Sequence, residues 1–287
     1  MPKSGILNIY KPRGITSNAV VTRIKRLTGE KTGHTGTLDP DAEGVLPICI
    51  GKATKAAGML TDSDKAYRAG IRLGVVTDTQ DMTGTVLETS DANISAEEFE
   101  AAVNSFVGEI SQIPPMYSAI KMNGQPLYKL ARKGLEVERK PRNIKIYEIK
   151  ILSFDGSKGE IEVYCSKGTY IRTLCDDIGR KLGCGAAMDG LIRIKSGGFD
   201  VKDSAMLEEI EKNPDKLNEI LIPTDKLFPY KKLSLKDSAA KAVLNGNPVL
   251  CEGLEKGEKY RLYSPSGEFL CVSVYTGNML KMEKSFY

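Results

Sequence analysis

Segments that alternate apolar and polar residues, as half-buried strands do, outnumber the helical segments of this chain. One runs over Lys65–Gly74, where every second residue from Tyr67 to Leu73 is apolar or aromatic. Further strands are expected at residues 6–10, 45–50, 117–122, 144–154, 160–166 and 191–199, and a strand at 85–88 is expected to pair with 65–74. Some of them are joined by hairpin turns such as Asn123-Gly124. The pattern predicts an α+β fold with a mixed, mostly antiparallel sheet flanked by helices.

Local signals also predict where the helices begin and end. Apolar residues recur at helical spacing after Ser17, which is expected to be the N-cap, and Gly29 is expected to end that helix. The sequence Ser95-Ala96-Glu97-Glu98 has the form of a capping box that opens a helix reaching about residue 107. Further helices are expected at 127–133, which is short, and at 170–182, 204–221 and 235–244.

The length of 287 residues favours two domains. A boundary is expected after Ile222-Pro223-Thr224-Asp225, so we divide the chain into residues 1–228 and 229–287. The second part combines one helix with short strands, and its roughly 60 residues are few for independent stability. We expect it to pack against the first part.

Composition excludes several classes of function. The single histidine, His34, and six scattered cysteines give no zinc-ligand cluster, and only His34 could serve a Ser-His-Asp triad. The segment Gly44–Lys52 has the wrong glycine spacing for a phosphate loop. We therefore expect no metal and no cofactor. No apolar run reaches the ~20 residues of a membrane helix, and the first is too short for a signal peptide, so a cytoplasmic protein is expected.

Positive charge is concentrated in two segments although the whole chain carries only +4. Residues 1–31 hold seven Lys/Arg and one acid, and residues 118–150 hold nine Lys/Arg and three acids, so each segment carries +6. Such segregation suits binding to a phosphate backbone, which releases counterions. Solvated faces of ordinary helices and strands explain the same pattern, and charge alone does not decide between the two.

The segment from Gly33 to Pro47, Gly-His-Thr-Gly-Thr-Leu-Asp-Pro-Asp-Ala-Glu-Gly-Val-Leu-Pro, is the densest cluster of polar and turn-forming residues. Its glycines permit close approach of a ligand, and Pro40 biases Asp39 toward an extended backbone. An aspartate held in this way could be aimed at a substrate. A structural Asx turn is the simpler interpretation of the same residues.

This segment resembles the signature loop of the TruB family, the tRNA pseudouridine-55 synthases. Other blocks resemble family motifs in the family's order. They are residues 7–17 (the N-terminal motif), 65–69 (the tyrosine motif), 114–134 (the RNA-gripping segment) and 168–174 (the arginine motif). Residues 187, 188 and 194 depart from the family, which usually has a histidine and an Arg-Thr pair there. The C-terminal part resembles a PUA-type RNA-binding domain more weakly.

The resemblance implies the pseudouridine synthase fold and isomerisation of uridine 55 in the T loop of tRNA by a monomer. It implies that Asp39 is the catalytic carboxylate, that Arg172 pairs with it, and that Tyr67 stacks on the base and takes part in proton removal. Tyr170 and Leu191 would contact substrate, and His34 would fill the space left by the flipped base. Candidates for contacts to the RNA backbone are Lys11, Arg13, Lys121, Arg132 and Lys133.

The residues suit this reaction because it exchanges one bond of the sugar for another and needs no redox partner. Asp39 could attack the ribose C1′ or remove a sugar proton, and the sequence does not choose between these routes. An RNA chaperone that uses the same basic surface is the alternative from another class. A phosphate-transfer enzyme is a third, weakened by the failed phosphate-loop spacing.

Overall fold

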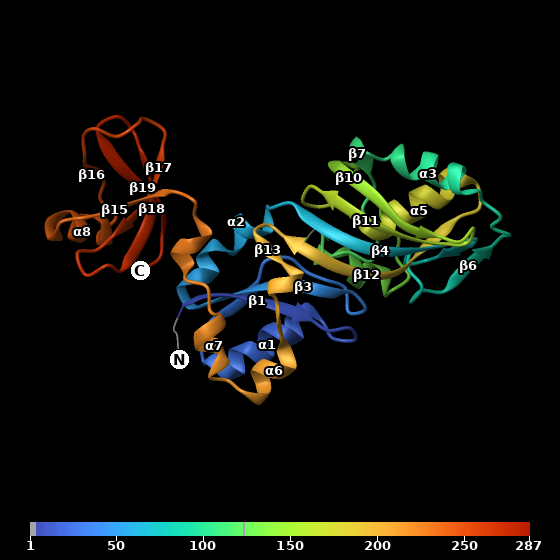
Figure 1. Cartoon of the computed structure of the whole chain (residues 1–287), viewed down its shortest axis with the longest axis horizontal. Coiled ribbons are helices and arrows are strands. Elements are labelled where there is room, and N and C mark those ends of the chain that lie inside the picture. Colours follow the sequence, from blue (N-terminus) through green and yellow to red (C-terminus); the bar gives the residue numbers. More distant parts are fainter. Residues whose placement is uncertain (1–3, 123) are drawn as a thin grey trace.

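A large sheet of ten strands forms the centre of the molecule in the computed structural model, which describes residues 4–122 and 124–287. Eight strands follow the order β14-β1-β3-β12-β4-β11-β10-β7, β2 pairs with β3, and β13 pairs with β12 (Figure 1). Their bounds are β1 Gly5–Lys11, β2 Thr32–His34, β3 Glu43–Ile50, β4 Lys65–Leu73, β7 Gly108–Gln112, β10 Arg142–Phe154, β11 Lys158–Cys165, β12 Ala186–Ser196, β13 Phe199–Asp200 and β14 Ala205–Met206. Most pairs are antiparallel and two are parallel, as the predicted mixed sheet requires.

The sheet consists of two halves that meet at one short parallel pair. In that pair Ile192 and Arg193 of β12 lie opposite Glu43 and Gly44 of β3. One half packs a core of Leu7, Val20 and Leu46 under α1 (Ser17–Thr28), α6 (Leu207–Lys212) and α7 (Lys216–Ile220). The other packs a larger core under α3 (Ala96–Asn104) and α5 (Ile171–Leu182). The junction therefore places the loop before β3 between two cores.

Two of the three local signals for helix ends are confirmed and one is wrong, and α3 ends at Asn104, before the expected residue 107. Gly29 ends α1 in the left-handed conformation, and the Ser95 capping box opens α3 as predicted. The N-cap of α1 is Thr16, whose side chain accepts a hydrogen bond from the Ala19 N–H, so the prediction of Ser17 is wrong. Ser17 is buried, and its hydroxyl bonds to the backbone of Leu38 instead.

A second sheet of five strands forms the C-terminal unit, in the order β15-β17-β18-β19-β16. Its elements are β15 Lys231–Ser234, α8 Asp237–Leu244, β16 Val249–Leu250, β17 Lys259–Tyr263, β18 Phe269–Tyr275 and β19 Met279–Ser285. Phe228, Val272 and Phe286 pack with Ala56 of the first unit in one buried cluster. The small unit therefore rests on the large one through apolar contact, and together they form the expected α+β fold with a small C-terminal β-rich domain.

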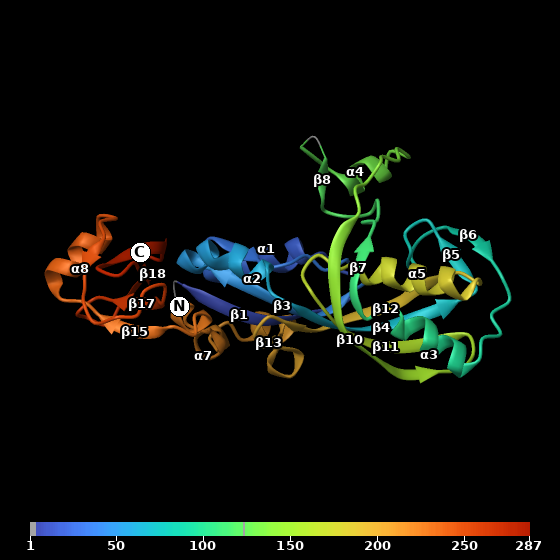
Figure 2. The ribbon, with the colours of Figure 1, turned by 90° about the horizontal axis from the view of Figure 1, so that it is seen from above.

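A basic arm, residues 113–122 and 124–140, extends away from the large sheet between β7 and β10 (Figure 2). It contains β8 (Lys121–Met122), β9 (Gln125–Pro126) and α4 (Leu127–Ala131). The strand predicted at 117–122 is thus limited to its last two residues, and Asn123 of the predicted turn lies outside the described residues. Within the predicted strand Tyr117 and Ile120 are only half-buried and Ala119 is exposed, so the segment has no buried apolar face that would extend the strand.

Two further predictions are corrected. The strand expected at 85–88 is β6 (Val86–Thr89), and it pairs with β5 (Val75–Thr77) and not with β4. The helix expected at 204–221 is divided into β14, α6 and α7, because Pro214 interrupts it. Among the residues described, no helix is both long enough and apolar enough to cross a membrane.

Candidate active site

Asp39 lies in the loop that connects β2 to β3, at the junction of the two halves of the sheet. The hydroxyl of Ser17 donates to the Leu38 carbonyl at 3.0 Å and accepts from the Leu38 N–H at 2.8 Å, which fixes the residue before Asp39. At the other end Gly44 has φ +101°, and a Cβ there would lie 2.3 Å from the Arg193 carbonyl oxygen. Only glycine fits this position. The loop is therefore rigidly held on both sides of the carboxylate, while 41% of the Asp39 side chain stays exposed.

Lys11 supports the same loop from inside the protein. Its ammonium donates to the carbonyls of Pro12, Pro40 and Ala42 at 3.0, 3.0 and 2.6 Å, and the residue is fully buried. Burial lowers its pKa to about 8, although the charge of Asp39 acts in the opposite direction. The prediction that Lys11 contacts an RNA phosphate is therefore wrong, because no phosphate can reach a side chain enclosed in this way.

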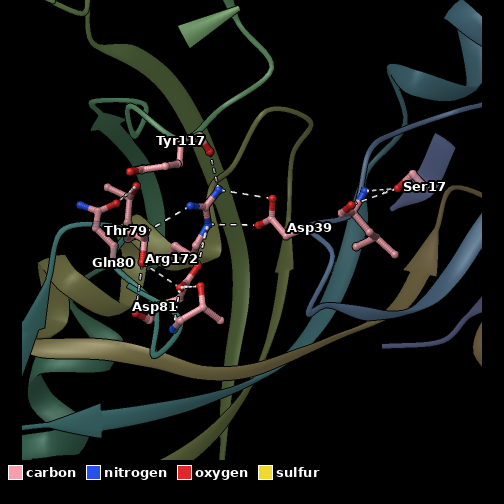
Figure 3. A network of polar contacts seen from close by, with 10 residues as sticks. Ser17, Asp39, Thr79, Gln80, Asp81, Tyr117 and Arg172 are labelled. Atoms are coloured by element: carbon pink, nitrogen blue, oxygen red, sulfur yellow. Dashed lines mark hydrogen bonds and ion pairs between the residues drawn. The ribbon is translucent and has the colours of Figure 1, made fainter. Parts of the chain in front are cut away.

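Arg172, the second residue of α5, forms the ion pair expected with Asp39. Its Nε lies 3.1 Å from Asp39 Oδ2 and 3.8 Å from Asp81 Oδ2. The two terminal nitrogens donate to the carbonyls of Thr79 at 3.2 Å and Tyr117 at 2.7 Å (Figure 3). Only 6% of the Arg172 side chain is exposed, so its orientation is set by these four partners. A guanidinium fixed in this way presents a defined edge to the carboxylate.

The protonation of Asp39 depends on opposing influences. Desolvation by the surrounding chain raises the pKa of the Asp39 carboxyl, the Arg172 charge lowers it, and the Asp81 charge raises it again. The net direction is upward from the ordinary value of 3.8. Asp39 is therefore a stronger base than an aspartate in water, and Arg172 limits the effect.

Tyr67 lies on β4 and interacts with a buried arginine of the neighbouring strand. Burial raises the pKa of the Tyr67 phenol, while the charge of Arg193 and a hydrogen bond to it act in the opposite direction. Arg193 is 1% exposed and donates to the carbonyls of Val45 at 2.7 Å and Gly36 at 3.1 Å. It therefore connects the phenol of Tyr67 to both ends of the loop that carries Asp39.

The remaining predicted substrate residues surround this centre on separate elements. His34 ends β2, its Nδ1 accepts from the Gly36 N–H at 3.3 Å, and burial with the Arg193 charge lowers its pKa, so its imidazole is neutral at pH 7. Tyr170 precedes α5, and the Gln112 side chain bonds to both its backbone N–H and its carbonyl. Leu191 of β12 is 9% exposed and lies opposite Ala69 of β4.

The other basic candidates are exposed. Lys121, Arg132 and Lys133 all belong to the basic arm, and the Arg132 guanidinium lies 5.6 Å from the centre of the Tyr128 ring. Arg13 is 63% exposed and faces Asp41 at 3.6 Å. All four side chains are exposed to solvent, unlike Lys11, and Arg13 is already paired with Asp41.

The sequence interpretation missed the contributions of three residues. Thr79 and Asp81 lie in a segment that it treated as a connection between strands, although two aspartates and three threonines within Thr77–Gly84 signalled a structured turn. Arg193 was not singled out as a functional residue, because it was considered only as the neighbour of residue 194, where the chain departs from the family motif. No group of three or more His, Cys, Asp or Glu in the described part of the chain could hold a metal ion.

Comparisons with known proteins agree with this geometry. The TruB family pseudouridylate synthase N-terminal domain matches residues 24–171, and the tRNA pseudouridylate synthase B C-terminal domain matches residues 172–229. The tRNA pseudouridine synthase B of Clostridium novyi (strain NT) is 47% identical over 287 residues, which cover 98% of this chain and 99% of the relative. That of Stutzerimonas stutzeri (strain A1501) is 44% identical over 274 residues, covering 93% and 90%. A solved H/ACA RNP bound to a substrate RNA containing 2'-deoxyuridine contains a chain with a TM-score of 0.72 and 26% identity, covering 99% of this chain and 85% of that one.

Proposed function

The chain belongs to the TruB family of tRNA pseudouridine synthases, which isomerise uridine in tRNA, and on this premise we propose that it acts on uridine 55 of the T loop through Asp39. The observation that carries the proposal is the pair of Asp39 and Arg172. The carboxylate is 41% exposed, whereas the guanidinium that holds it is 6% exposed and bonded to two carbonyls. In such a pair the Asp39 carboxylate stays accessible to a substrate, while the Arg172 guanidinium that orients it is fixed.

In the proposed reaction the bond between ribose C1′ and uracil N1 breaks and a bond between C1′ and C5 forms. The proton leaves C5 and N1 becomes protonated, so the product is an isomer of the substrate and no electrons are exchanged with a cofactor. Asp39 acts at the sugar, either by attack on C1′ or by removal of a sugar proton. Both routes require the ionised carboxylate, which Arg172 favours.

Tyr67 is proposed to stack on the uracil and to assist removal of the C5 proton. Flipping a nucleotide out of its stack costs a few kcal/mol, and stacking on an aromatic ring returns about 1–3 kcal/mol. Arg193 supports this role because its charge favours the ionised phenol, against the effect of burial. His34, Tyr170 and Leu191 are proposed to contact the substrate from the surrounding strands and from the start of α5.

RNA binding is proposed to involve Arg13 and the exposed basic residues of the arm. The relatives are named as tRNA enzymes, and a structural neighbour was solved with a substrate RNA, which supports an RNA partner for this surface. Lysines and arginines that meet phosphates position the RNA without reading its sequence. Recognition of the T arm would then come from the shape of its loop and from the flipped base. We propose that a monomer in the cytoplasm does this work.

Release of tritium from a T-arm RNA transcribed with C5-tritiated uridine tests the proposal, with no metal or nucleotide added. We expect stoichiometric release from one position, and mapping should place the pseudouridine at position 55. An RNA in which cytidine replaces uridine 55 is the matched control and should release nothing. Release of equal size from the control, or none from either RNA at stoichiometric enzyme, contradicts the proposal.

A further inference from the structure

The loop that holds Arg172 has an unusual backbone at Gln80. Its φ is +64°, and it is the one non-glycine residue with a positive φ among those described. Residues with a Cβ disfavour this left-handed region, so the conformation persists only where other contacts impose it. Contacts with neighbouring groups must therefore hold Gln80 in this conformation.

The side chain of Gln80 is held at both ends by α5. Its amide nitrogen donates to Asp176 Oδ2 at 2.9 Å, and its amide oxygen accepts from Thr173 Oγ1 at 2.8 Å. Asp176 and Thr173 are 3% and 4% exposed, so neither can move without disturbing the helix. The backbone of Gln80 is fixed too, because its carbonyl accepts from the Met188 N–H of β12 at 3.0 Å.

The residues on either side of Gln80 are both partners of Arg172. The Thr79 carbonyl accepts from one terminal nitrogen, and the Asp81 carboxylate faces Nε. Asp81 is in turn held by the hydroxyls of Thr79 and Thr83 at 2.8 and 2.6 Å. Helix α5 therefore carries Arg172 as well as Thr173 and Asp176, the two side chains that fix the loop to which Arg172 binds.

We propose that Gln80 is a positioning residue for the isomerisation, because its bonds to Thr173 and Asp176 hold the two loop groups that orient the Arg172 guanidinium toward Asp39. The inference rests on the proposed role of Asp39 and Arg172. The side chain of Gln80 bonds to Asp176 and Thr173 and not to Asp39, so Gln80 acts only through the arginine. If the bonds of the Gln80 side chain to Thr173 and Asp176 are lost, the loop moves away from Arg172. The guanidinium is then no longer fixed in its orientation toward Asp39.

Gln80→Gly is the variant that tests this, since glycine adopts a positive φ without strain and removes only the side-chain clamp. We expect kcat to fall about tenfold while KM stays within twofold, because transition-state alignment is lost and RNA binding is not. Thr173→Val keeps the shape of the side chain, removes one of the two bonds, and should lower kcat about threefold. Thr85→Ala in the same loop is the control, because the Thr85 side chain is exposed.

A second measurement does not depend on turnover. The pKa of Asp39 is followed by carbon NMR of labelled aspartates in the free enzyme. In Gln80→Gly we expect it to rise above the wild-type value, since the Arg172 charge, which lowers it more than the Asp81 charge raises it, is no longer held against the carboxylate. A global effect on stability would not shift this one carboxyl, and thermal unfolding of each variant measures that effect separately.

The outcomes separate the inference from the proposed function. An unchanged pKa of Asp39 in Gln80→Gly overturns the inference whether or not the enzyme turns over RNA. A kcat within twofold of the wild type overturns it too, with the proposed function intact. Wild-type enzyme that releases no tritium refutes the proposed function, and the NMR titration still decides whether Gln80 positions the arginine.

Discussion

The loop that carries Asp39 and the basic arm are held by opposite means. Around Asp39, Lys11 and Arg172 direct their charges inward, onto five backbone carbonyls and the two carboxylates. In the arm, Lys121, Arg132 and Lys133 are exposed. Buried charges with many partners fix geometry, whereas exposed charges contribute attraction at little cost in order. The side chains proposed to attract RNA are therefore distinct from those that orient Asp39, although one backbone carbonyl of the arm, that of Tyr117, accepts from Arg172.

Asp39→Asn should have the largest effect. The amide keeps the shape of the side chain but lacks the basic oxygen, so kcat should fall by at least about 10³-fold, or ~4 kcal/mol of transition-state stabilisation. The affinity for T-arm RNA should stay within about threefold, because the arm is unchanged. Single-turnover tritium release and a filter-binding titration measure the two quantities. Equal losses in both would show that the regions are not separate.

Lys11→Met should cost about 3 kcal/mol of unfolding free energy, because three carbonyls lose their donor inside the protein. Lys133→Met in the arm is the matched control and should change stability by no more than about 0.5 kcal/mol. Urea unfolding measures both. If the two lysines cost the same, the contrast between inward and outward charge is mistaken.

Arg172→Lys keeps the charge beside Asp39 but cannot reach two carbonyls and two carboxylates at once. We expect kcat to fall about 10²-fold, with little change in RNA affinity. The same tritium assay, run with saturating RNA, gives kcat directly. Wild-type kcat in this variant would mean that the geometry of the guanidinium does not matter.

The pH dependence of kcat should reflect the raised pKa of Asp39. The ionised carboxylate is the active form, so kcat should fall about tenfold per pH unit below that pKa, and it should begin to fall at a higher pH than for an ordinary aspartate. Thermal unfolding across the same range excludes loss of fold as the cause. An acid limb at or below the ordinary value of 3.8 would contradict the upward shift.

Neutralising the arm should have the smallest effect on chemistry. In the double variant Arg132→Gln with Lys133→Gln we expect RNA affinity to fall about tenfold. The slope of the logarithm of the binding constant against the logarithm of the salt concentration should decrease by the equivalent of about two phosphate contacts. The kcat at saturating RNA should not change. Lys158→Gln with Lys241→Gln removes two exposed lysines outside the arm and is the control. A lower kcat in the arm variant would show that the charges of the arm also affect the chemistry at Asp39.

Much of the secondary structure and the position of the reactive loop were predictable from short stretches of sequence. Alternation gave the strands, the Ser95 capping box gave α3, and the residues around Asp39 indicated the reactive loop. Contacts between distant residues were not predictable without a resemblance, since Arg172 meets a partner 133 positions away. The burial of Lys11 was missed because a lysine at the end of a strand is normally solvated, and only the folded chain brings three carbonyls around it.

The parallel contact between β3 and β12 also has a consequence for synthesis on the ribosome. Gly44 and its neighbours emerge early, yet their partner Arg193 is translated about 150 residues later. Until then the loop before β3 lacks the strand that supports it, even after Arg172 has been translated. A polypeptide released before that point would carry both Asp39 and Arg172 without the buried Arg193 that bonds to Gly36 and Val45, so the loop would lack its support until translation passes Arg193.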